Sequence, residues 1–200
     1  MQKIFITATN TDIGKTFTTL KLMQHYAKKG YKVAALKPIE TGVDNFPPDG
    51  MKLLTLSQNL NPNLKNITIE DIVPITFELP AAPFIASQAQ KIDLDPIYKS
   101  IQKLQPLCDV LFIEGAGGLY VPINKDYFMI DLIEDLHVNK TILVTHCDLG
   151  CINDTLLSKH SLDQKKIPNE VYFNCKNGRE NFEKVSKPFF DAIDFKINFV

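Results

Sequence analysis

Short apolar runs alternate along the chain with segments that can form helices. Five of these runs are strand-like, at residues 3–8, 33–39, 109–114, 141–145 and 171–174. The stretches 110–113 and 142–144 are apolar without interruption, which is typical of parallel strands covered by helices on both faces. The pattern therefore predicts an α/β fold, with a parallel sheet in a single domain over residues 1–200.

Helices and loops are predicted between these runs. A helix is expected over residues 15–29, with Phe17 and Leu20 among its buried side chains. Two proline-containing segments, 42–50 and 74–83, predict loops, and a further helix is expected to begin near Asp49. We expect these loops to form the substrate side of a cleft.

The composition favours one soluble domain and argues against nucleic acid or a membrane as its partner. The chain has 200 residues, of which 44% are hydrophobic, and a formal net charge of -1. Its lysines are scattered, without a basic block interleaved with aromatic residues, so no nucleic-acid partner is expected. No run of eighteen apolar residues and no secretory signal pattern occurs. We therefore expect a cytoplasmic protein that does not contact a membrane.

Four cysteines lie in or beside the apolar runs, without close pairing: Cys108, Cys147, Cys151 and Cys175. This placement predicts reduced, mostly buried thiols in preference to disulfides. The histidines are dispersed and no second cysteine pair matches 147 and 151, so a zinc site is not expected.

The segments that follow the strand-like runs carry the candidate chemistry, because ligands of open parallel sheets bind beyond the carboxyl ends of the strands. Residues 9–16, Thr-Asn-Thr-Asp-Ile-Gly-Lys-Thr, lie at a strand-to-helix junction and are typical of a phosphate-binding loop. Gly14 lets the backbone approach an anion, Lys15 can bridge terminal phosphates, and the Thr16 hydroxyl can bind Mg²⁺. Thr9 stands where the usual spacing has a glycine.

A second lysine is expected near the first. Residues 36–42, Leu-Lys-Pro-Ile-Glu-Thr-Gly, place Lys37 at the end of the second strand. A lone lysine there is more often a surface charge. A second ammonium beside Lys15 would be costly in an empty site, but it suits a site that collects phosphate and an attacking acid group.

Glu114 ends a buried strand and precedes a glycine-rich turn over residues 115–118. A buried carboxylate needs a cation or hydrogen-bond donors. Mg²⁺ beside the Thr16 hydroxyl would meet that need, and so would a lysine. The glycines fit either a close approach to a ligand or a plain tight turn, and Asp49 fits either a Mg²⁺ ligand or a helix N-cap.

With residues 149–153, Leu-Gly-Cys-Ile-Asn, these motifs resemble the dethiobiotin synthetase family in order and spacing over residues 1–175. The resemblance implies a P-loop NTPase-like domain and an ATP- and Mg²⁺-dependent cyclo-ligase of biotin biosynthesis. Such an enzyme joins 7,8-diaminononanoate and CO₂, or bicarbonate, into the ureido ring of dethiobiotin and releases ADP and phosphate. The resemblance also implies a homodimer.

The same resemblance assigns roles to motif residues. Lys15 would hold the β- and γ-phosphates, and Lys37 would be the catalytic residue that stabilises the carbamate and the transferring phosphoryl group. The implied Mg²⁺ ligands, which also contact the nucleotide, are Thr16, Asp49 and Glu114. Further implied nucleotide contacts are Asp12, Ile13, Gly14, Phe17, Gly115, Ala116, Gly117 and Asn174. Implied substrate contacts besides Lys37 are Thr11, Thr41 and Gly118, and Gly150, Cys151 and Asn153 would hold the carboxylate tail across the dimer interface.

Three positions depart from the family pattern. Ala8 replaces the leading glycine of the loop, and Ala82 stands where a serine is usual. After Asn174 the chain continues through residues 176–179 and ends at Val200, without the proline- and glycine-containing segment that completes the base pocket.

Three other protein classes share parts of this pattern. Partitioning-type regulatory ATPases carry a lysine five residues before Lys15, where this chain has Asn10. Amide-forming ligases of the cobyrinate type are longer and carry a glutaminase domain. A non-catalytic nucleotide-binding module would leave Lys37 and Glu114 without a role.

The third departure predicts relaxed base specificity. GTP and CTP are expected to support turnover nearly as well as ATP, because the triphosphate is gripped well and the base poorly. Titrating the purified enzyme with each nucleotide measures this. A strong preference for ATP over every other triphosphate would refute it.

Overall fold

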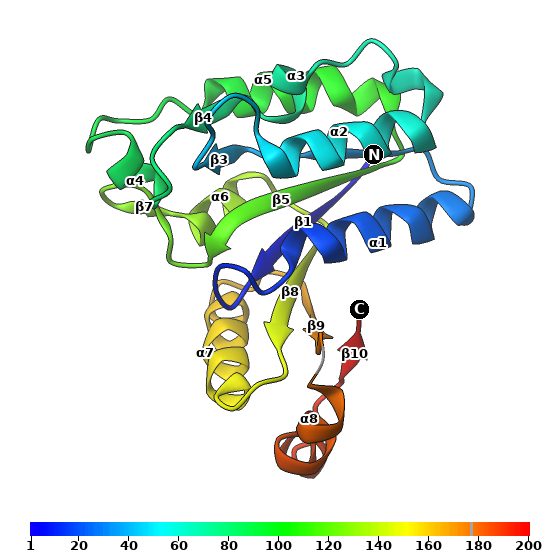
Figure 1. The fold of residues 1–200 in the computed structure, drawn as a ribbon, viewed down its shortest axis with the longest axis vertical. Helices are drawn as coiled ribbons and strands as arrows, with labels where there is room; N and C mark the ends of the chain where they lie inside the picture. The colour runs from blue at the N-terminus through cyan, green and yellow to red at the C-terminus, as the bar shows by residue number, and fades with distance from the viewer. Residues whose placement is uncertain (177) are drawn as a thin grey trace.

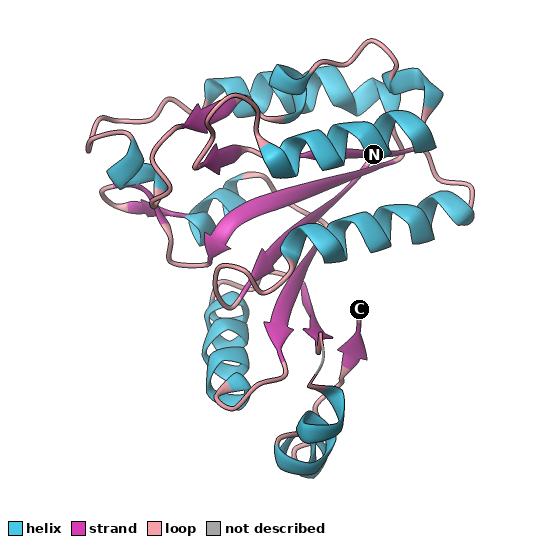
Figure 2. Cartoon of the chain, in the orientation of Figure 1, coloured by secondary structure: helices cyan, strands magenta, loops and turns pink. Residues whose placement is uncertain are grey.

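A six-stranded parallel sheet forms the centre of the molecule in the computed structural model, which describes residues 1–176 and 178–200 (Figures 1 and 2). The strands lie side by side in the order β10-β9-β8-β1-β5-β2. Their bounds are β1 Gln2–Ala8, β2 Val33–Leu36, β5 Val110–Gly118, β8 Lys140–His146, β9 Asn169–Asn174 and β10 Asn198–Phe199.

Helices flank this sheet, and α1 and α7 approach the central strands from opposite sides in the view of Figure 1. The α-helices are α1 Lys15–Lys28, α2 Pro48–Leu60, α3 Ile69–Ile72, α4 Pro83–Ala86, α5 Asp95–Leu104, α6 Met129–Asp135, α7 Cys151–Gln164, α8 Arg179–Val185 and α9 Lys187–Ala192. Short 3-10 helices cover Pro62–Leu64 and Gln105–Leu107. Within the described residues, no helix is both long and apolar enough to cross a membrane.

The predicted fold class is confirmed, and the five predicted strands all form. The strands at the centre of the sheet are fully buried, including Phe5, Ile6 and Phe112. Unbroken apolar runs are therefore the signature of strands with both faces covered. Neighbouring β1 and β5 run parallel, so the phosphate-binding loop after β1 and the end of β5 meet at one edge of the sheet.

The predicted end of the second strand, at residue 39, is wrong. The second run ends at Leu36, because Pro38 has no N–H to continue a ladder. Beyond it, β3 (Ile39–Thr41) pairs with β4 (Ile75–Phe77) in a separate two-stranded sheet. A small antiparallel pair, β6 (Pro122–Asn124) and β7 (Tyr127–Phe128), also escaped prediction.

The glycine-rich segment after Glu114 is strand and not the expected turn, because β5 continues to Gly118. The register between β1 and β5 shifts here, from Ile6 opposite Glu114 to Ala8 opposite Gly118. Glycine permits the close approach: a Cβ on Gly115 would lie 2.8 Å from a Phe5 ring atom. Ala8 remains part of β1 despite its departure from the family pattern, since it is buried and paired with both β5 and β8.

Helix α1 forms as predicted but presents a different face to the core. Phe17 is 49% exposed, whereas Thr18, Thr19 and Met23 are buried. Polar side chains occupy the inner face because α1 begins at the sheet edge, directly beside the buried Glu114 carboxylate.

The expectation of four reduced thiols is wrong for one pair, since Cys147 and Cys175 form a disulfide. Strands β8 and β9 are parallel and adjacent, with His146 opposite Asn174, so the next residue of each strand end faces the other. This pairing depends on strand register, which sequence spacing does not reveal. Cys108 and Cys151 are buried free thiols, as predicted.

Opening the disulfide is expected to destabilise the fold. It closes a sequence separation of 28 residues, so Cys175→Ser should lower the free energy of unfolding by about 3–4 kcal/mol. In urea denaturation, dithiothreitol should lower the free energy of unfolding of the wild type by a similar amount. It should not change that of the Cys175→Ser variant. Cys108→Ala serves as the control and should keep the response to dithiothreitol. Identical unfolding curves of the wild type with and without dithiothreitol would contradict the disulfide.

Candidate active site

Ten of the residues singled out by sequence line one cavity of about 480 Å³ at the carboxyl edge of the sheet. They come from the loop after β1 and the start of α1, the residue after β2, the end of β3, the start of α2 and the end of β5. They are Thr11, Asp12, Gly14, Lys15, Thr16, Lys37, Thr41, Asp49, Ala116 and Gly117. The sequence motifs that end different strands therefore meet in one place.

The phosphate-binding loop spans the gap between β1 and α1. The residue before α1, Gly14, has a φ of 100°, a backbone conformation that residues with a side chain rarely adopt. An added Cβ there would also clash with the Asn174 amide. Lys15 folds back over the loop, and its Nζ donates to the Asn10 carbonyl at 3.3 Å.

Glu114 lies fully buried beneath this loop and is bound by three donors. Its Oε1 accepts from Lys37 Nζ at 2.7 Å and from the Thr16 hydroxyl at 2.8 Å. Its Oε2 accepts from the Thr19 hydroxyl at 2.8 Å. One carboxylate therefore ties β5, α1 and the residue after β2 together. Of the two partners proposed for it by sequence, Mg²⁺ and a lysine, the lysine lies beside it, and the Thr16 hydroxyl donates to it directly.

Lys37 is almost completely buried, with 5% of its surface exposed. Burial pulls the pKa of Lys37 down, but the charge of Glu114 and its hydrogen bond, helped by Asp49 and Glu40, raise that pKa above its ordinary value. The Asp49 carboxylate lies 4.0 Å from Lys37 Nζ. Lys37 is therefore a fixed cation at the floor of the cavity and not a surface charge.

Lys15 faces the opposite electrostatic situation. Burial, and secondarily repulsion from Lys37, lower the pKa of Lys15 to about 8. No carboxylate within the described chain forms an ion pair with its ammonium. A polyanion that entered the cavity would relieve this repulsion, which is the behaviour expected of a phosphate site.

Asp49 lies in the first turn of α2, whose N-cap is Pro47, so the N-cap interpretation of Asp49 is wrong. The residue that satisfies this helix end is Glu40, whose Oε1 and Oε2 accept from the backbone N–H groups of Asp49 and Gly50, each at 2.9 Å. Burial outweighs these bonds and raises the pKa of Glu40. Burial would also raise the pKa of Asp49, but Lys37 and Lys52 hold it below its ordinary value.

Sequence reasoning missed Glu40 and Thr19. Glu40 stands inside the quoted Lys-Pro-Ile-Glu-Thr-Gly motif, and its position one residue before Thr41 on β3 was a usable signal. Thr19 lies one helical turn after Thr16, so both hydroxyls face Glu114 from the same side of α1. No motif marks that second threonine.

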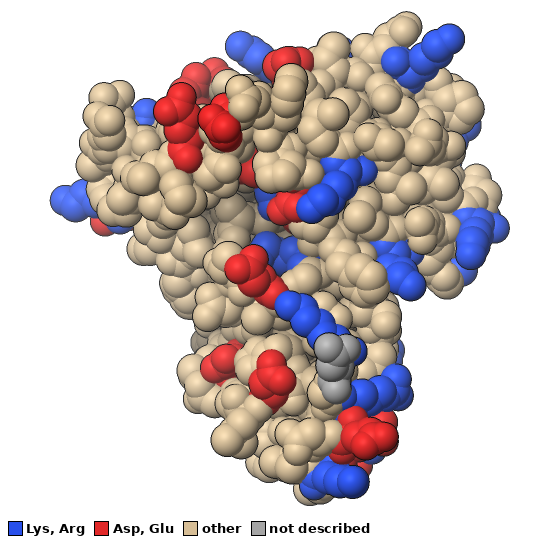
Figure 3. All heavy atoms as spheres, in the orientation of Figure 1, with Lys and Arg blue, Asp and Glu red and all other residues tan. Residues whose placement is uncertain are grey.

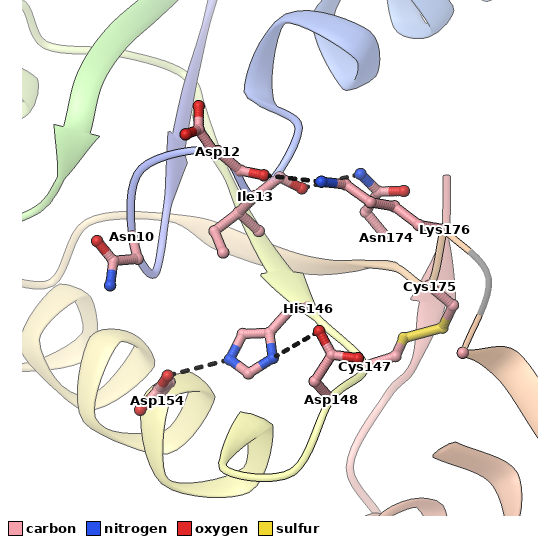
Figure 4. A pocket seen from close by; sticks show the side chains of 11 residues that line it. Asn10, Asp12, Ile13, His146, Cys147, Asp148, Asp154, Asn174, Cys175 and Lys176 are labelled. Atoms are coloured by element: carbon pink, nitrogen blue, oxygen red, sulfur yellow. Dashed lines mark hydrogen bonds and ion pairs between the residues drawn. A yellow bond between two sulfur atoms is a disulfide. The ribbon is translucent and has the colours of Figure 1, made fainter. Parts of the chain in front are cut away.

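A neighbouring cavity of about 540 Å³ holds two more of the expected nucleotide contacts, Ile13 and Asn174 (Figure 4). Asn174 Nδ2 donates to the Ile13 carbonyl at 2.8 Å, so the end of β9 binds the loop itself. His146, for which sequence predicted no individual role, also lines this cavity, with Nε2 3.0 Å from an Asp154 oxygen.

Several expected contacts lie apart from the 480 Å³ cavity. Phe17 does not line it, and Gly118 pairs with Ala8 in the sheet. Gly115 contributes its carbonyl, 3.4 Å from Lys37 Nζ. Ala82 precedes α4 as its N-cap. Asn177, within the divergent segment 176–179, lies outside the described residues.

The predicted tail-binding residues begin α7. Asn153 is exposed there, and Gly150 has a φ of 100°. The Cys151 side chain is fully buried, so a ligand could reach only its backbone, and burial raises the pKa of its thiol. Their part in substrate binding stays a prediction.

Charged side chains on the face drawn in Figure 3 are dispersed, with basic and acidic residues interspersed. Buried charge is concentrated at the cavity, where Lys15 and Lys37 line the wall and the fully buried Glu114 pairs with Lys37 behind it. A glycine-ended loop that opens a helix, a parallel sheet and these paired charges define the class as a P-loop nucleotide-binding protein.

Comparison with known proteins identifies the family of the chain within this class. A family described as an AAA domain matches residues 2–189. The ATP-dependent dethiobiotin synthetase of Sulfurovum sp. (strain NBC37-1) is 48% identical over 193 residues, which cover 96% of this chain and 91% of that protein. The synthetase of Wolinella succinogenes is 38% identical over 192 residues, covering 94% and 88%. The chain belongs to the ATP-dependent dethiobiotin synthetase family, as its motifs indicated.

Solved structures share the fold at much lower identity. A plasmid partition protein from Borrelia burgdorferi has a TM-score of 0.58 and 13% identity, covering 99% of this chain and 87% of that one. At this identity the likeness concerns the sheet and its helices alone. It confirms the P-loop fold without favouring a partitioning function.

Replacing Glu40 with glutamine tests its role in holding α2. Glu40→Gln replaces one of the two accepting oxygens with an NH₂ group, which cannot accept a hydrogen bond. One backbone N–H at the start of α2 then loses its partner, which should lower the free energy of unfolding by about 1–3 kcal/mol. Chemical denaturation should show this loss, and Glu78→Gln, which changes an exposed carboxylate, should not. Equal stability of the Glu40→Gln variant and the wild type would contradict the capping role.

Proposed function

We propose that this chain is an ATP-dependent dethiobiotin synthase. It closes the ureido ring of dethiobiotin from 7,8-diaminononanoate and CO₂, with release of ADP and phosphate, in biotin biosynthesis. Membership of the synthetase family supports the reaction. The observation that carries the proposal is the buried Lys37–Glu114 pair, 2.7 Å apart, at the floor of a cavity formed by a phosphate-binding loop.

The reaction needs positioning and charge neutralisation and no covalent enzyme intermediate. One amine of the substrate takes up CO₂ to form a carbamate, whose oxygen attacks the γ-phosphate of ATP. The second amine then attacks the carbonyl carbon of the resulting mixed anhydride, closes the ring and expels phosphate. Catalysis of this kind rests on aligned reactants and fixed cations in a site that excludes water.

We assign the two cations different tasks in this sequence. Lys15, whose ammonium is not paired with a carboxylate of the described residues, holds the β- and γ-phosphates. Lys37 stabilises the carbamate and the phosphoryl group as negative charge moves between them. Its ion pair with Glu114 keeps the ammonium protonated against the opposing effect of burial, and holds it in place. Thr11 and Thr41, which line the same cavity, are placed to orient the diamine.

The residues present fit Mg²⁺. Thr16, Asp49 and Glu114 offer one hydroxyl and two carboxylates, the hard oxygen ligands that Mg²⁺ prefers. In the described part of the chain no three His, Cys, Asp or Glu side chains form a metal-binding group. This agrees with a cation shared with substrate phosphates, which needs only one or two carboxylates. When bound, Mg²⁺ would neutralise phosphate charge.

We also propose that residues 1–200 work as one domain within a homodimer in the cytoplasm, where ATP is available. Large apolar side chains are exposed on and beside α4 and α7, which lie on the same side in Figure 1: Ile85, Leu149 and Leu157. Exposed apolar surface of this kind supports an interface between copies. With a second copy there, the start of α7 could hold the carboxylate tail of a substrate bound in the partner's site.

Removing either lysine should slow turnover. Lys15→Ala or Lys37→Ala is expected to lower kcat by about 10²-fold or more, in line with the loss of one preorganised charge donor. Circular dichroism checks the fold, and Lys37→Gln, which keeps a donor to Glu114, separates lost charge from lost packing. Lys65→Ala, an exposed lysine, should leave turnover unchanged. Near-normal kcat in either alanine variant would remove that lysine from the mechanism.

Substrate dependence tests the function itself. Phosphate release from ATP should appear only when the diamine and bicarbonate are supplied together, because the carbamate is the nucleophile. Phosphate assays that omit each component in turn measure this. Steady ATP hydrolysis without the diamine would favour a regulatory ATPase instead.

A further inference from the structure

Two cavities meet at the phosphate-binding loop. The smaller contains Lys15 and Lys37, and the larger contains Asn174 (Figure 4). Among the described residues, Asp12 and Lys176 line both. Lys176 Nζ donates to the Asp12 carbonyl at 3.0 Å, so its ammonium lies at the boundary between the cavities.

The two cavities differ in charge. Carboxylates of Asp148 and Asp154 stand in the wall of the larger one and would repel a phosphate chain. The smaller one contains the two buried ammonium groups. Its carboxylates Glu40 and Asp49 are compensated, since Glu40 accepts from two backbone N–H groups and Asp49 lies 4.0 Å from Lys37 Nζ. A nucleotide would therefore place its triphosphate in the smaller cavity and its sugar and base in the larger. The junction between sugar and phosphate would then fall at the boundary, beside Lys176.

Lys176 is held at this place by its neighbours in the chain. Cys175 is bonded to Cys147 at the end of β8, and Asn174 donates to the Ile13 carbonyl. The segment thus binds two consecutive carbonyls of the loop, Asp12 and Ile13, through two side chains. Lys176 also has a φ of 26°, a left-handed value that non-glycine residues rarely adopt. Such backbone conformations persist where surrounding contacts hold them.

We propose that Lys176 is a further nucleotide-binding residue that contacts the α-phosphate, the phosphate nearest the sugar. A lysine ammonium has three donors, of which the Asp12 carbonyl takes one. The others can bind a phosphate oxygen. Because every nucleotide carries this phosphate, the contact contributes affinity that does not depend on the base. The inference rests on the proposed function, since it places a nucleotide in this site.

Calorimetric titration of the purified full chain with ATP, ADP and GTP, each with Mg²⁺ and without the diamine, tests the contact. Lys176→Met should weaken all three nucleotides by the same factor, about tenfold or more, as expected for one charge-assisted hydrogen bond. Lys15→Ala should instead weaken ATP more than ADP, because Lys15 is assigned to the outer phosphates.

Two further variants separate phosphate binding from a structural role. Lys176→Arg keeps the charge and should restore most of the affinity, whereas a purely structural loss would persist in both variants. Lys184→Met, an exposed lysine on α8, makes the same change in net charge and should bind as the wild type does. Thermal unfolding confirms that each variant is folded.

The inference is overturned if Lys176→Met binds all three nucleotides as the wild type does, if Lys176→Arg is as weak as Lys176→Met, or if the loss is confined to ATP. A wild-type protein that binds no nucleotide would overturn the proposed function as well. The two failures are therefore distinguishable in one set of titrations.

Discussion

A fully buried carboxylate, Glu114, is the constraint on which the rest of the site depends. An ionised carboxylate in a protein interior is costly unless it is paired and hydrogen-bonded. Here one ammonium and two hydroxyls supply the pairing, from Lys37, Thr16 and Thr19. These partners belong to the segment after β2 and to α1, while Glu114 belongs to β5. The carboxylate therefore fixes the start of the P-loop helix relative to the sheet before any ligand binds.

The same pairing leaves Lys15 without a carboxylate partner among the described residues. Glu114 neutralises Lys37, but Lys15 remains buried nearby with a lowered pKa. In the proposed reaction a triphosphate would supply the missing anion, and the carbamate would add a second negative group beside Lys37. The site is thus organised by an internal ion pair and completed by its substrates, which is the arrangement that electrostatic catalysis requires. Glu40 supports it by fixing the helix end that carries Asp49.

Much of this architecture could be predicted from sequence. Apolar runs gave the strands, and the positions just after them gave the P-loop, Lys37 and Glu114. Parallel strands bring their carboxyl ends to one edge, so residues 100 positions apart along the chain could be expected to meet. The separation of Thr16 and Glu114, 98 residues, is closed by the adjacent pairing of β1 and β5.

Other features depend on geometry that residue types do not encode. The rotation of α1 decides that Thr19 is buried and Phe17 exposed. The register of β8 against β9 decides that Cys147 meets Cys175. The position at which α2 begins decides that Glu40, and not Asp49, satisfies the helix end. Each of these is set by packing between elements, so a local sequence pattern could not reveal it.

The assigned places of the metal and of Lys37 are tested most directly by a crystal structure with Mn²⁺ in place of Mg²⁺, a non-hydrolysable ATP analogue and the diamine. We expect anomalous scattering from the metal beside the Thr16 hydroxyl and the Asp49 and Glu114 carboxylates, with the Lys37 ammonium directed at the γ-phosphate. A metal bound elsewhere, with Lys37 turned toward solvent, would contradict these assignments.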